Sequence, residues 1–229
     1  MTTHRFFVPS ADAQGDRFAI PASIERQVRT VLRLREGERI TILTGDGREA
    51  ICRLDGGQCV VEERRAATGE PVHRLTVVQA LLKGDALEAV VQHATELGVA
   101  AFELVVTERC VAREISERKL DRLRAIAREA AEQSERGIVP PVHAPTPLVR
   151  ALTPSSVLLY ERQENLRLGD LDRPSRVVIG PEGGFSEAEI RAAHTVGATA
   201  AGLGPRILRS ETVAVAAAAV ILSRTGDFA

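Results

Sequence analysis

From Leu75 onward, short apolar runs alternate with longer segments of helical period, and this alternation limits the possible folds more than any other feature. The runs typical of buried strands are "LTVVQALL", "AFELVV", "VLLYE" and "RVVIG". The helical segments are "DALEAVVQHATELG", "SERKLDRLRAIAREAAEQSER", "SEAEIRAAHTVG" and a last one from Ser210. Gly98 is expected to end the first helix and Ser116 to cap the second, which a Pro-rich connector follows. The pattern predicts an α/β domain with a mostly parallel sheet.

The first 70 residues have another rhythm, in which short β-like runs are separated by turns. "GDG" at residues 45–47 predicts a hairpin turn, and "SIERQVRTVLRL" predicts one helix capped by Ser23. The apolar face of that helix would carry Ile24, Val28, Val31 and Leu32. "AATGEPVH" is typical of a linker. We therefore expect a small β-barrel domain over residues 1–72 and the α/β domain over residues 73–229.

Composition excludes several functional classes. A net charge of −1 and a pI near 6.5 give no global argument for a polyanionic partner, so any nucleic-acid contact must come from local patches. Three cysteines without C-x-x-C spacing and five scattered histidines argue against a disulfide framework and a metal site. The N-terminus has no signal-peptide core, and "VAVAAAAVIL" is too short to span a bilayer. We expect a cytoplasmic protein.

Three loops follow strand-like runs, where open α/β sheets bind ligands: "YERQEN", "GPEGGF" and "GLGPRILRSET". In the second loop, Gly183 and Gly184 remove side chains where a ligand could meet bare backbone, and Ser186 with Glu189 forms a capping box. The loop has neither the Lys-Ser/Thr of a P-loop nor a dinucleotide fingerprint. A plain strand-to-helix turn is the alternative.

The third loop strengthens the functional interpretation. It combines glycine and proline with Arg206 and Arg209, and Ser210 is expected to cap the helix that follows. Arg209 would then project beside a helix N-terminus, where anions are favoured. The two loops together predict a ligand cleft that is lined by backbone.

Several separated motifs resemble those of one family. "IGPEGGF", "LGPRILRSET", "ATELGV", "EAAEQSERGIVPP", "HRFFV" and "VLRLREGE" resemble the RsmE family, the uridine-N3 methyltransferases of small-subunit ribosomal RNA. The resemblance covers nearly the whole chain. His93, Gln27 or Val28, and "SETV" depart from the usual residues of that family, chiefly where RNA would be contacted.

The resemblance implies a fold, a cofactor and partners. The fold is a trefoil-knotted α/β domain of the SPOUT class, preceded by a PUA-like β-barrel that binds RNA. The cofactor is S-adenosyl-L-methionine, the substrate is 16S ribosomal RNA of the small ribosomal subunit, and the enzyme is a homodimer whose active sites use both chains. The near-continuous apolar surface of the last helix also favours burial against a second copy.

The resemblance also implies site residues. Those expected to hold the cofactor are Leu159, Tyr160, Glu161, Ile179, Gly180, Pro181, Gly183, Gly184, Leu203, Gly204, Ile207, Leu208 and Ser210. Arg209 and Arg136 are candidates to stabilise charge on the uracil oxygens, although Arg136 could instead be a solvated helix end. Glu182 could act on the base or bind backbone N–H groups, and Glu132 and Gln133 could shape the same wall.

For RNA binding, the candidates are His4, Arg5, Arg26, Arg29 and Arg33. A surface strand and a salt-bridged solvent face are the alternatives for these residues. Two other functions stay open at this point, namely a non-catalytic RNA-binding or assembly module and a knotted methyltransferase that acts on transfer RNA.

Overall fold

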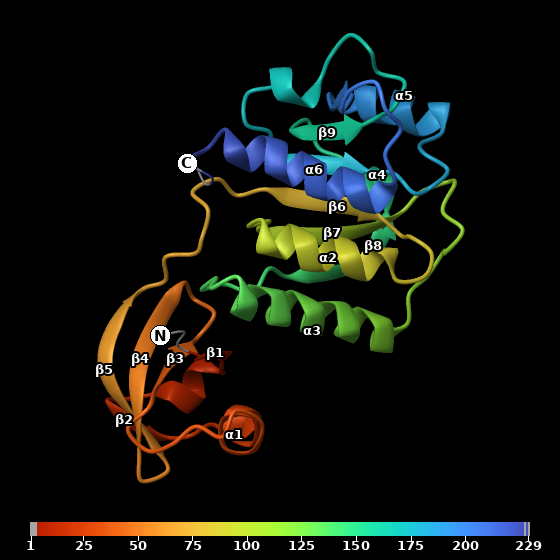
Figure 1. Cartoon of the computed structure of the whole chain (residues 1–229). Coiled ribbons are helices and arrows are strands. Elements are labelled where there is room, and N and C mark those ends of the chain that lie inside the picture. Colours follow the sequence, from red (N-terminus) through yellow and green to blue (C-terminus); the bar gives the residue numbers. More distant parts are fainter. Residues whose placement is uncertain (1–3, 227, 229) are drawn as a thin grey trace. The chain divides into compact units, whose positions relative to one another are not determined.

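The computed structural model describes residues 4–226 and 228, which form two compact units (Figure 1). Unit 1 comprises residues up to Glu70 together with the segment Ala131–Val139. Unit 2 comprises Pro71–Ala130 and the chain from Pro140 onward. The division differs from the expected one because nine residues from the middle of the chain belong to the first unit.

Unit 1 is built on a five-stranded sheet with the order β1-β3-β4-β5-β2. Its strands are β1 (His4–Phe7), β2 (Arg17–Ala19), β3 (Arg39–Leu43), β4 (Arg48–Asp55) and β5 (Gln58–Ala66). β1 runs parallel to β3, and the other pairs are antiparallel. The expected hairpin joins β3 to β4, and both Gly45 and Gly47 adopt positive φ there. Phe6, Ile40 and Ile42 lie in the core of the unit.

The helix of unit 1 begins and turns differently from the prediction. α1 (Ala22–Arg26) follows Pro21 without a side-chain cap, so the expectation that Ser23 caps it was wrong. It continues as a π-helical turn, η2 (Gln27–Val31). Because a π turn holds more residues than an α turn, it shifts the phase of the apolar stripe. Ile24 and Val28 are buried as expected, whereas Val31 is 65% exposed.

Residues 131–139 join unit 1 through apolar packing and hydrogen bonds. Ala131 and Val139 pack against Phe7 and Leu43 of the sheet. Two short 3-10 turns were also not predicted, η1 (Ser10–Ala13) in unit 1 and η3 (Leu168–Asp170) in unit 2.

Unit 2 contains a six-stranded sheet with the order β11-β9-β10-β6-β7-β8, in which every pair is parallel. Its strands are β6 (Thr76–Ala80), β7 (Ala101–Val106), β8 (Val142–Pro147), β9 (Ser156–Leu159), β10 (Arg176–Ile179) and β11 (Thr199–Ala201). The predicted parallel α/β architecture is therefore confirmed. Because the strands are parallel, the loops that follow β6, β9 and β10 leave the sheet at the same edge.

One strand of this sheet lies where a Pro-rich connector was expected. β8 contains Pro145 and Pro147, which cannot donate backbone hydrogen bonds. It is tolerated because β8 is an edge strand that pairs only with β7, and its register shifts between Glu103 and Val105.

Four of the five helices of unit 2 were predicted, in the observed order, and only the short α4 was not expected. The five helices are α2 (Ala86–Glu96), α3 (Glu117–Gln133), the short α4 (Leu148–Ala151), α5 (Glu187–Thr195) and α6 (Ser210–Ser223). The Ser116 hydroxyl accepts from Lys119 N, and Ser186 with Glu189 forms the expected capping box. α2 and α6 pack against each other (Figure 1). No helix among the described residues is long and apolar enough to cross a membrane.

Candidate functional site

A cavity of about 610 Å³ opens at the carboxyl ends of β9 and β10, entirely within unit 2. Its size is within the range of small-molecule sites, about 300–1,000 Å³. Three loops and two helix starts form its wall. The lining residues are Ala86, Leu159, Tyr160, Glu161, Ile179, Gly180, Pro181, Glu182, Gly183, Gly184, Phe185, Leu203, Gly204, Arg206, Ile207, Leu208, Arg209, Ser210, Glu211 and Val213.

Every residue expected to hold the cofactor lies on this wall, and so do Glu182 and Arg209. The structure therefore brings together three loops that are far apart in the sequence. It does so because β9, β10 and β11 are neighbours in a parallel sheet, with their carboxyl ends at one edge. The binding roles of the individual residues stay predictions.

The loop that follows β10 needs its glycines. A Cβ on Gly180 would lie 3.3 Å from the Phe185 ring, and Gly184 has a φ of +67°. The Arg109 side chain donates to Gly183 O at 3.0 Å. A side chain at Gly180 would crowd Phe185, and one at Gly184 would strain the backbone, so the bare backbone of this loop is a requirement of its geometry.

Glu182 makes a defined backbone contact at the rim of the cavity. Its Oε1 accepts a hydrogen bond at 3.0 Å from the backbone N–H of Lys83, in the loop after β6. Glu182 thus binds a backbone N–H group, which was the alternative to a direct role toward the base, and the contact joins the loop after β6 to the loop after β10. The carboxylate nevertheless lines the cavity, so its role toward a substrate stays a prediction.

The loop before α6 presents two arginines and an apolar side chain at the cavity. Arg206 and Arg209 are exposed, and Ile207 is 86% exposed. Arg209 occupies the N-cap position of α6 without a capping side chain. Within the described part of the chain, the guanidinium groups of Arg206 and Arg209 have no hydrogen-bond or ion-pair partner, so both are available to a ligand.

Ser210 does not cap α6, contrary to the prediction. It is the first residue of the helix and is buried. Its hydroxyl donates to Gly180 O at 2.7 Å and accepts from Gln79 Nε2 at 3.0 Å. The hydroxyl therefore joins the loop after β10 to the start of α6.

Beside Arg206 and Arg209, the lining combines apolar side chains with carboxylates that suit a positively charged group of a ligand. Leu159, Ile179 and Leu203 supply apolar surface, while three carboxylates lie on the wall, those of Glu161, Glu182 and Glu211. The Glu161 carboxylate lies beside Gly184, 3.4 Å from the position of an added Cβ. Carboxylates favour a positive ligand by direct Coulomb attraction. These residues fit S-adenosylmethionine, which carries a sulfonium, an ammonium group and an adenine.

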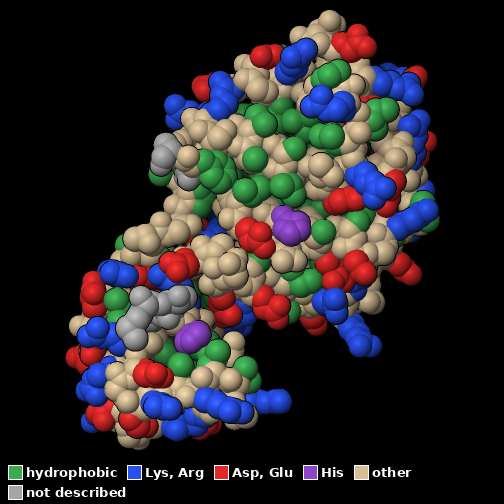
Figure 2. All heavy atoms as spheres, in the orientation of Figure 1, with side chains coloured by type: hydrophobic (Ala, Val, Ile, Leu, Met, Phe, Trp, Pro, Cys, Tyr) green, Lys and Arg blue, Asp and Glu red, His purple; other side chains and the backbone are tan. Residues whose placement is uncertain are grey.

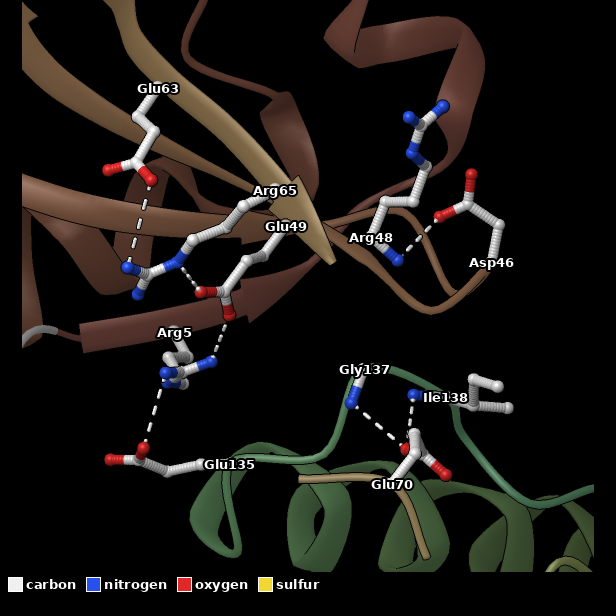
Figure 3. Close-up of polar contacts among 10 residues, drawn as sticks. All are labelled: Arg5, Asp46, Arg48, Glu49, Glu63, Arg65, Glu70, Glu135, Gly137 and Ile138. Atoms are coloured by element: carbon white, nitrogen blue, oxygen red, sulfur yellow. Dashed lines mark hydrogen bonds and ion pairs between the residues drawn. The ribbon is translucent and has the colours of Figure 1, made fainter. Parts of the chain in front are cut away.

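Arg136 lies in unit 1 and is not among the residues that line the cavity. Its side chain is 2% exposed and donates to Glu70 Oε2 at 2.9 Å. Glu70 Oε1 also accepts from the backbone N–H groups of Gly137 at 3.0 Å and Ile138 at 2.9 Å (Figure 3). Within one chain, these contacts assign Arg136 to the structure of unit 1.

The neighbouring Glu132 and Gln133 also lie in unit 1 and off the cavity wall, so the expectation that they shape that wall was wrong for a single chain. Glu132 Oε1 accepts from the backbone N–H of Phe7 at 3.0 Å and so connects the end of α3 to β1.

Arg5 is held by two carboxylates from distant parts of unit 1. It donates to Glu49 at 2.5 Å and to Glu135 at 3.2 Å, and its side chain is 11% exposed (Figure 3). Burial alone would raise the pKa of the Glu49 carboxyl, but hydrogen bonds from Arg65 and Arg5 hold that pKa below its ordinary value. The contacts support a structural role for Arg5 over the predicted RNA contact.

The other RNA candidates remain at the surface of unit 1. Arg26, Arg29 and Arg33 are exposed, and His4 is half-buried. Arg29 forms an i, i+4 ion pair with Glu25 at 3.5 Å. The helix formed by α1 and η2 ends at Val31, and Arg33, which adopts a φ of +54°, lies beyond it. The three arginines therefore do not form one continuous helical stripe.

Sequence reasoning missed five lining residues: Ala86, Phe185, Arg206, Glu211 and Val213. Ala86 opens α2 after β6, so the rule that ligands bind at the carboxyl ends of strands would have identified it if applied to a fourth loop. Arg206 was noted within its loop but not assigned to the site. Phe185 and Val213 lie within the quoted motifs "GPEGGF" and "SETV", so their position in these motifs was the signal that could have identified them.

The cysteines lie outside this cavity, and all three are free and buried. Burial raises the pKa of the Cys52 thiol to about 12 and that of Cys59 to about 11, so both stay protonated near neutral pH. In the described ranges, no three His, Cys, Asp or Glu side chains are grouped so as to hold a metal ion.

Comparisons with known proteins agree with this geometry. Residues 68–222 match a family model described as an RNA methyltransferase domain, and residues 28–63 match one described as an RNA methyltransferase PUA domain. The ribosomal RNA small subunit methyltransferase E of Bacillus subtilis (strain 168) is 31% identical over 96% of each chain.

Solved structures are similar over the same range. The ribosomal RNA small subunit methyltransferase E of Neisseria gonorrhoeae, bound to S-adenosyl methionine, has a TM-score of 0.88 and 32% identity and is matched over 100% of both chains. A Legionella pneumophila methyltransferase in complex with the same cofactor has a TM-score of 0.83 and 29% identity over 98% of both chains.

Proposed function

The chain belongs to the RNA methyltransferase family, and we propose that it transfers a methyl group from S-adenosylmethionine to N3 of one uridine in the 16S RNA of the small ribosomal subunit. The observation that carries the proposal is the cavity of unit 2, where two glycine-rich loops and three carboxylates surround an apolar wall.

The cofactor would be held by the three loops at the strand ends. Apolar side chains such as Leu159, Ile179 and Leu208 would enclose the adenine, and backbone groups of the loop after β10 would bind its polar edge. Glu161 lies where it would balance positive charge. S-adenosylmethionine, when bound, supplies an electrophilic methyl group.

The chain must favour loss of the N3 proton, because a neutral imide nitrogen is a poor nucleophile. A tenfold larger fraction of the anion requires about 1.4 kcal/mol of selective stabilisation. The guanidinium of Arg209 is exposed at the cavity and unpaired within the described chain, so it can donate to a uracil oxygen that gains negative charge. Arg206 would add to the same positive potential.

Glu182 and Arg136 have weaker support as catalytic residues. Glu182 is engaged with the backbone of Lys83, which would hold its carboxylate at a set position on the rim. Arg136 is buried against Glu70, which favours a structural role, and its catalytic role is a prediction that a variant can test.

RNA binding would fall to the exposed basic side chains of unit 1, namely Arg26, Arg29 and Arg33, together with the half-buried His4. Contacts of this kind are made mainly with phosphates and position the RNA without reading its sequence.

We also propose that the enzyme is a homodimer that packs through α6. The buried face of α6 includes Ala214, Ala217 and Ile221, and the half-exposed face is also apolar. Figure 2 shows hydrophobic side chains gathered over α6. A helix that is apolar nearly all round requires cover on more than one side. Ala216→Glu should therefore convert the dimer to a monomer in analytical ultracentrifugation, and an unchanged dimer would contradict this interface.

Two measurements test the proposed activity. Calorimetry should detect stoichiometric binding of S-adenosylmethionine to the wild-type chain, whereas absence of binding would favour a non-catalytic RNA-binding module. Primer extension on small-subunit RNA from cells that lack the protein should show loss of one polymerase stop, because an N3-methyl group blocks base pairing. Stops that all persist would contradict the proposed substrate.

A further inference from the structure

We propose that Gln79 is a positioning residue that fixes the spacing between the two glycine-rich loops of the cavity through the Ser210 hydroxyl. Gln79 Nε2 donates to Ser210 Oγ at 3.0 Å, and Ser210 Oγ donates to Gly180 O at 2.7 Å. Gly180 belongs to the loop after β10, and Ser210 is the first residue of α6. The inference rests on the proposed function, because it concerns the affinity for S-adenosylmethionine.

The directions of these hydrogen bonds follow from the groups involved. The same Gln79 nitrogen also lies 3.1 Å from Ala80 O, which can only accept, so the atom that faces both oxygens must be the amide nitrogen. Ser210 Oγ therefore accepts from Gln79 and has one proton left to donate. That proton is directed to Gly180 O. The two hydrogen bonds, from Gln79 Nε2 to Ser210 Oγ and from Ser210 Oγ to Gly180 O, therefore donate in the same direction, and together they are called the relay.

Gln79 is an unusual residue for its place in the fold. It lies on the central strand β6, in register with Ile179 of β10, and is fully buried. Its Oε1 is buried and finds no partner within the described residues. An unsatisfied buried polar atom is unfavourable, and an apolar side chain would avoid that cost. The hydrogen bond that the amide nitrogen donates to Ser210 offsets part of that cost.

The relay acts on the cavity without contacting a ligand. Gln79 is not among the lining residues, whereas Gly180 and Ser210 both are. Loss of the relay should let the start of α6 and the loop after β10 move independently. A preorganised site binds its ligand more tightly than a mobile one because less order must be imposed on binding. In a Gln79 variant the affinity should therefore fall although no residue that lines the cavity has changed.

The test measures cofactor affinity by calorimetry and loop mobility by amide hydrogen exchange of the ligand-free protein. Gln79→Leu and Ser210→Ala should each raise the dissociation constant for S-adenosylmethionine about tenfold. The double variant should be no weaker than either single variant, because both changes interrupt one relay. Exchange should speed up in residues 180–185 and 210–213 in all three.

One control separates positioning from general stability. Val77→Ala removes buried volume from the same strand and should lower the melting temperature without changing the dissociation constant. If Gln79→Leu does not fold, Ser210→Ala still tests the relay from its other end.

The outcomes are distinct. Unchanged affinity and exchange in Gln79→Leu, or strictly additive losses in the double variant, would overturn the relay while leaving the proposed function intact. A wild-type chain that does not bind S-adenosylmethionine would overturn the proposed function and the affinity claim together. Faster exchange at the two loops in the ligand-free variants would still support the structural link.

Discussion

Two pairs of arginines from the quoted motifs, one pair in each unit, are used in opposite ways. In unit 2, Arg206 and Arg209 stand exposed at a cavity, and no partner for either is present in the described chain. In unit 1, Arg5 and Arg136 are largely buried and bound to carboxylates. Both pairs lie in motifs that predicted function, so an arginine in a recognisable motif does not by itself show what the arginine does.

The difference comes from the position of the carboxylates. Glu49 is 44 residues from Arg5, and Glu70 is 66 residues from Arg136, so no local pattern reveals either pair. A buried guanidinium without its partner would be strongly destabilising, whereas an exposed one loses little when it is unpaired. The buried arginines should therefore affect stability, and the exposed ones activity.

The largest expected effect is at Arg209. Arg209→Ala should lower turnover about 1,000-fold, equivalent to roughly 4 kcal/mol, because a charge-stabilising donor is lost. The affinity for S-adenosylmethionine and the melting temperature should stay unchanged. Arg191→Ala, which removes an exposed arginine of α5 that lies off the cavity wall, is the matched control. Normal turnover in Arg209→Ala would remove Arg209 from the mechanism.

Next in size is the effect at Arg136. Arg136→Ala should lower the free energy of unfolding by about 3 kcal/mol, because Glu70 loses its buried partner. Turnover per folded molecule should not change. Denaturant titration measures the free energy of unfolding, and active-site titration gives the turnover per folded molecule. Glu70→Gln offers a milder second variant. Full stability combined with lost turnover would restore the catalytic role predicted for Arg136.

A smaller effect concerns the pH dependence of unit 1. The lowered pKa of Glu49 means that the unfolded chain binds more protons than the folded chain as pH falls below the ordinary value of 4.5. Stability should therefore be lost on acidification, and Glu49→Gln should flatten that loss by up to about 1.4 kcal/mol per pH unit. Glu63→Gln, at an exposed residue whose ion pair with Arg65 spans 3.8 Å, is the control. Equal acid slopes for the wild type and Glu49→Gln would show that the ionised Glu49 carboxylate does not stabilise unit 1.

The smallest effect compares two serines that were both expected to cap helices. Ser186→Ala should destabilise the chain by about 1 kcal/mol, because its hydroxyl accepts from Glu189 N at the start of α5. Ser23→Ala should change stability by less than about 0.3 kcal/mol, because α1 has no side-chain cap. Equal losses in thermal unfolding would show that Ser23 contributes to α1 after all.

Much of unit 2 could be predicted because its signals are local. Apolar runs, caps and glycine pairs each depend on residues within a few positions, and the parallel sheet then brings their loops together. Unit 1 was harder to predict. A π turn shifted the apolar face of its helix so that Val31 is exposed, and the distant segment Ala131–Val139 completed the unit. β8 was missed because its prolines are typical of a connector and are allowed only at a sheet edge.

The sequence alone determined the α/β alternation and the glycine-rich loops, because backbone conformation and hydrophobic period are properties of short segments. The residues expected to hold the cofactor were implied by the resemblance to a family, and their binding roles stay predictions. The tertiary structure alone decided which charged and polar groups meet. It placed Arg136 against Glu70, Arg5 against Glu49, and Gln79 against Ser210. Such pairs join residues that are far apart in the chain, and their strength depends on burial and distance, neither of which a sequence pattern contains.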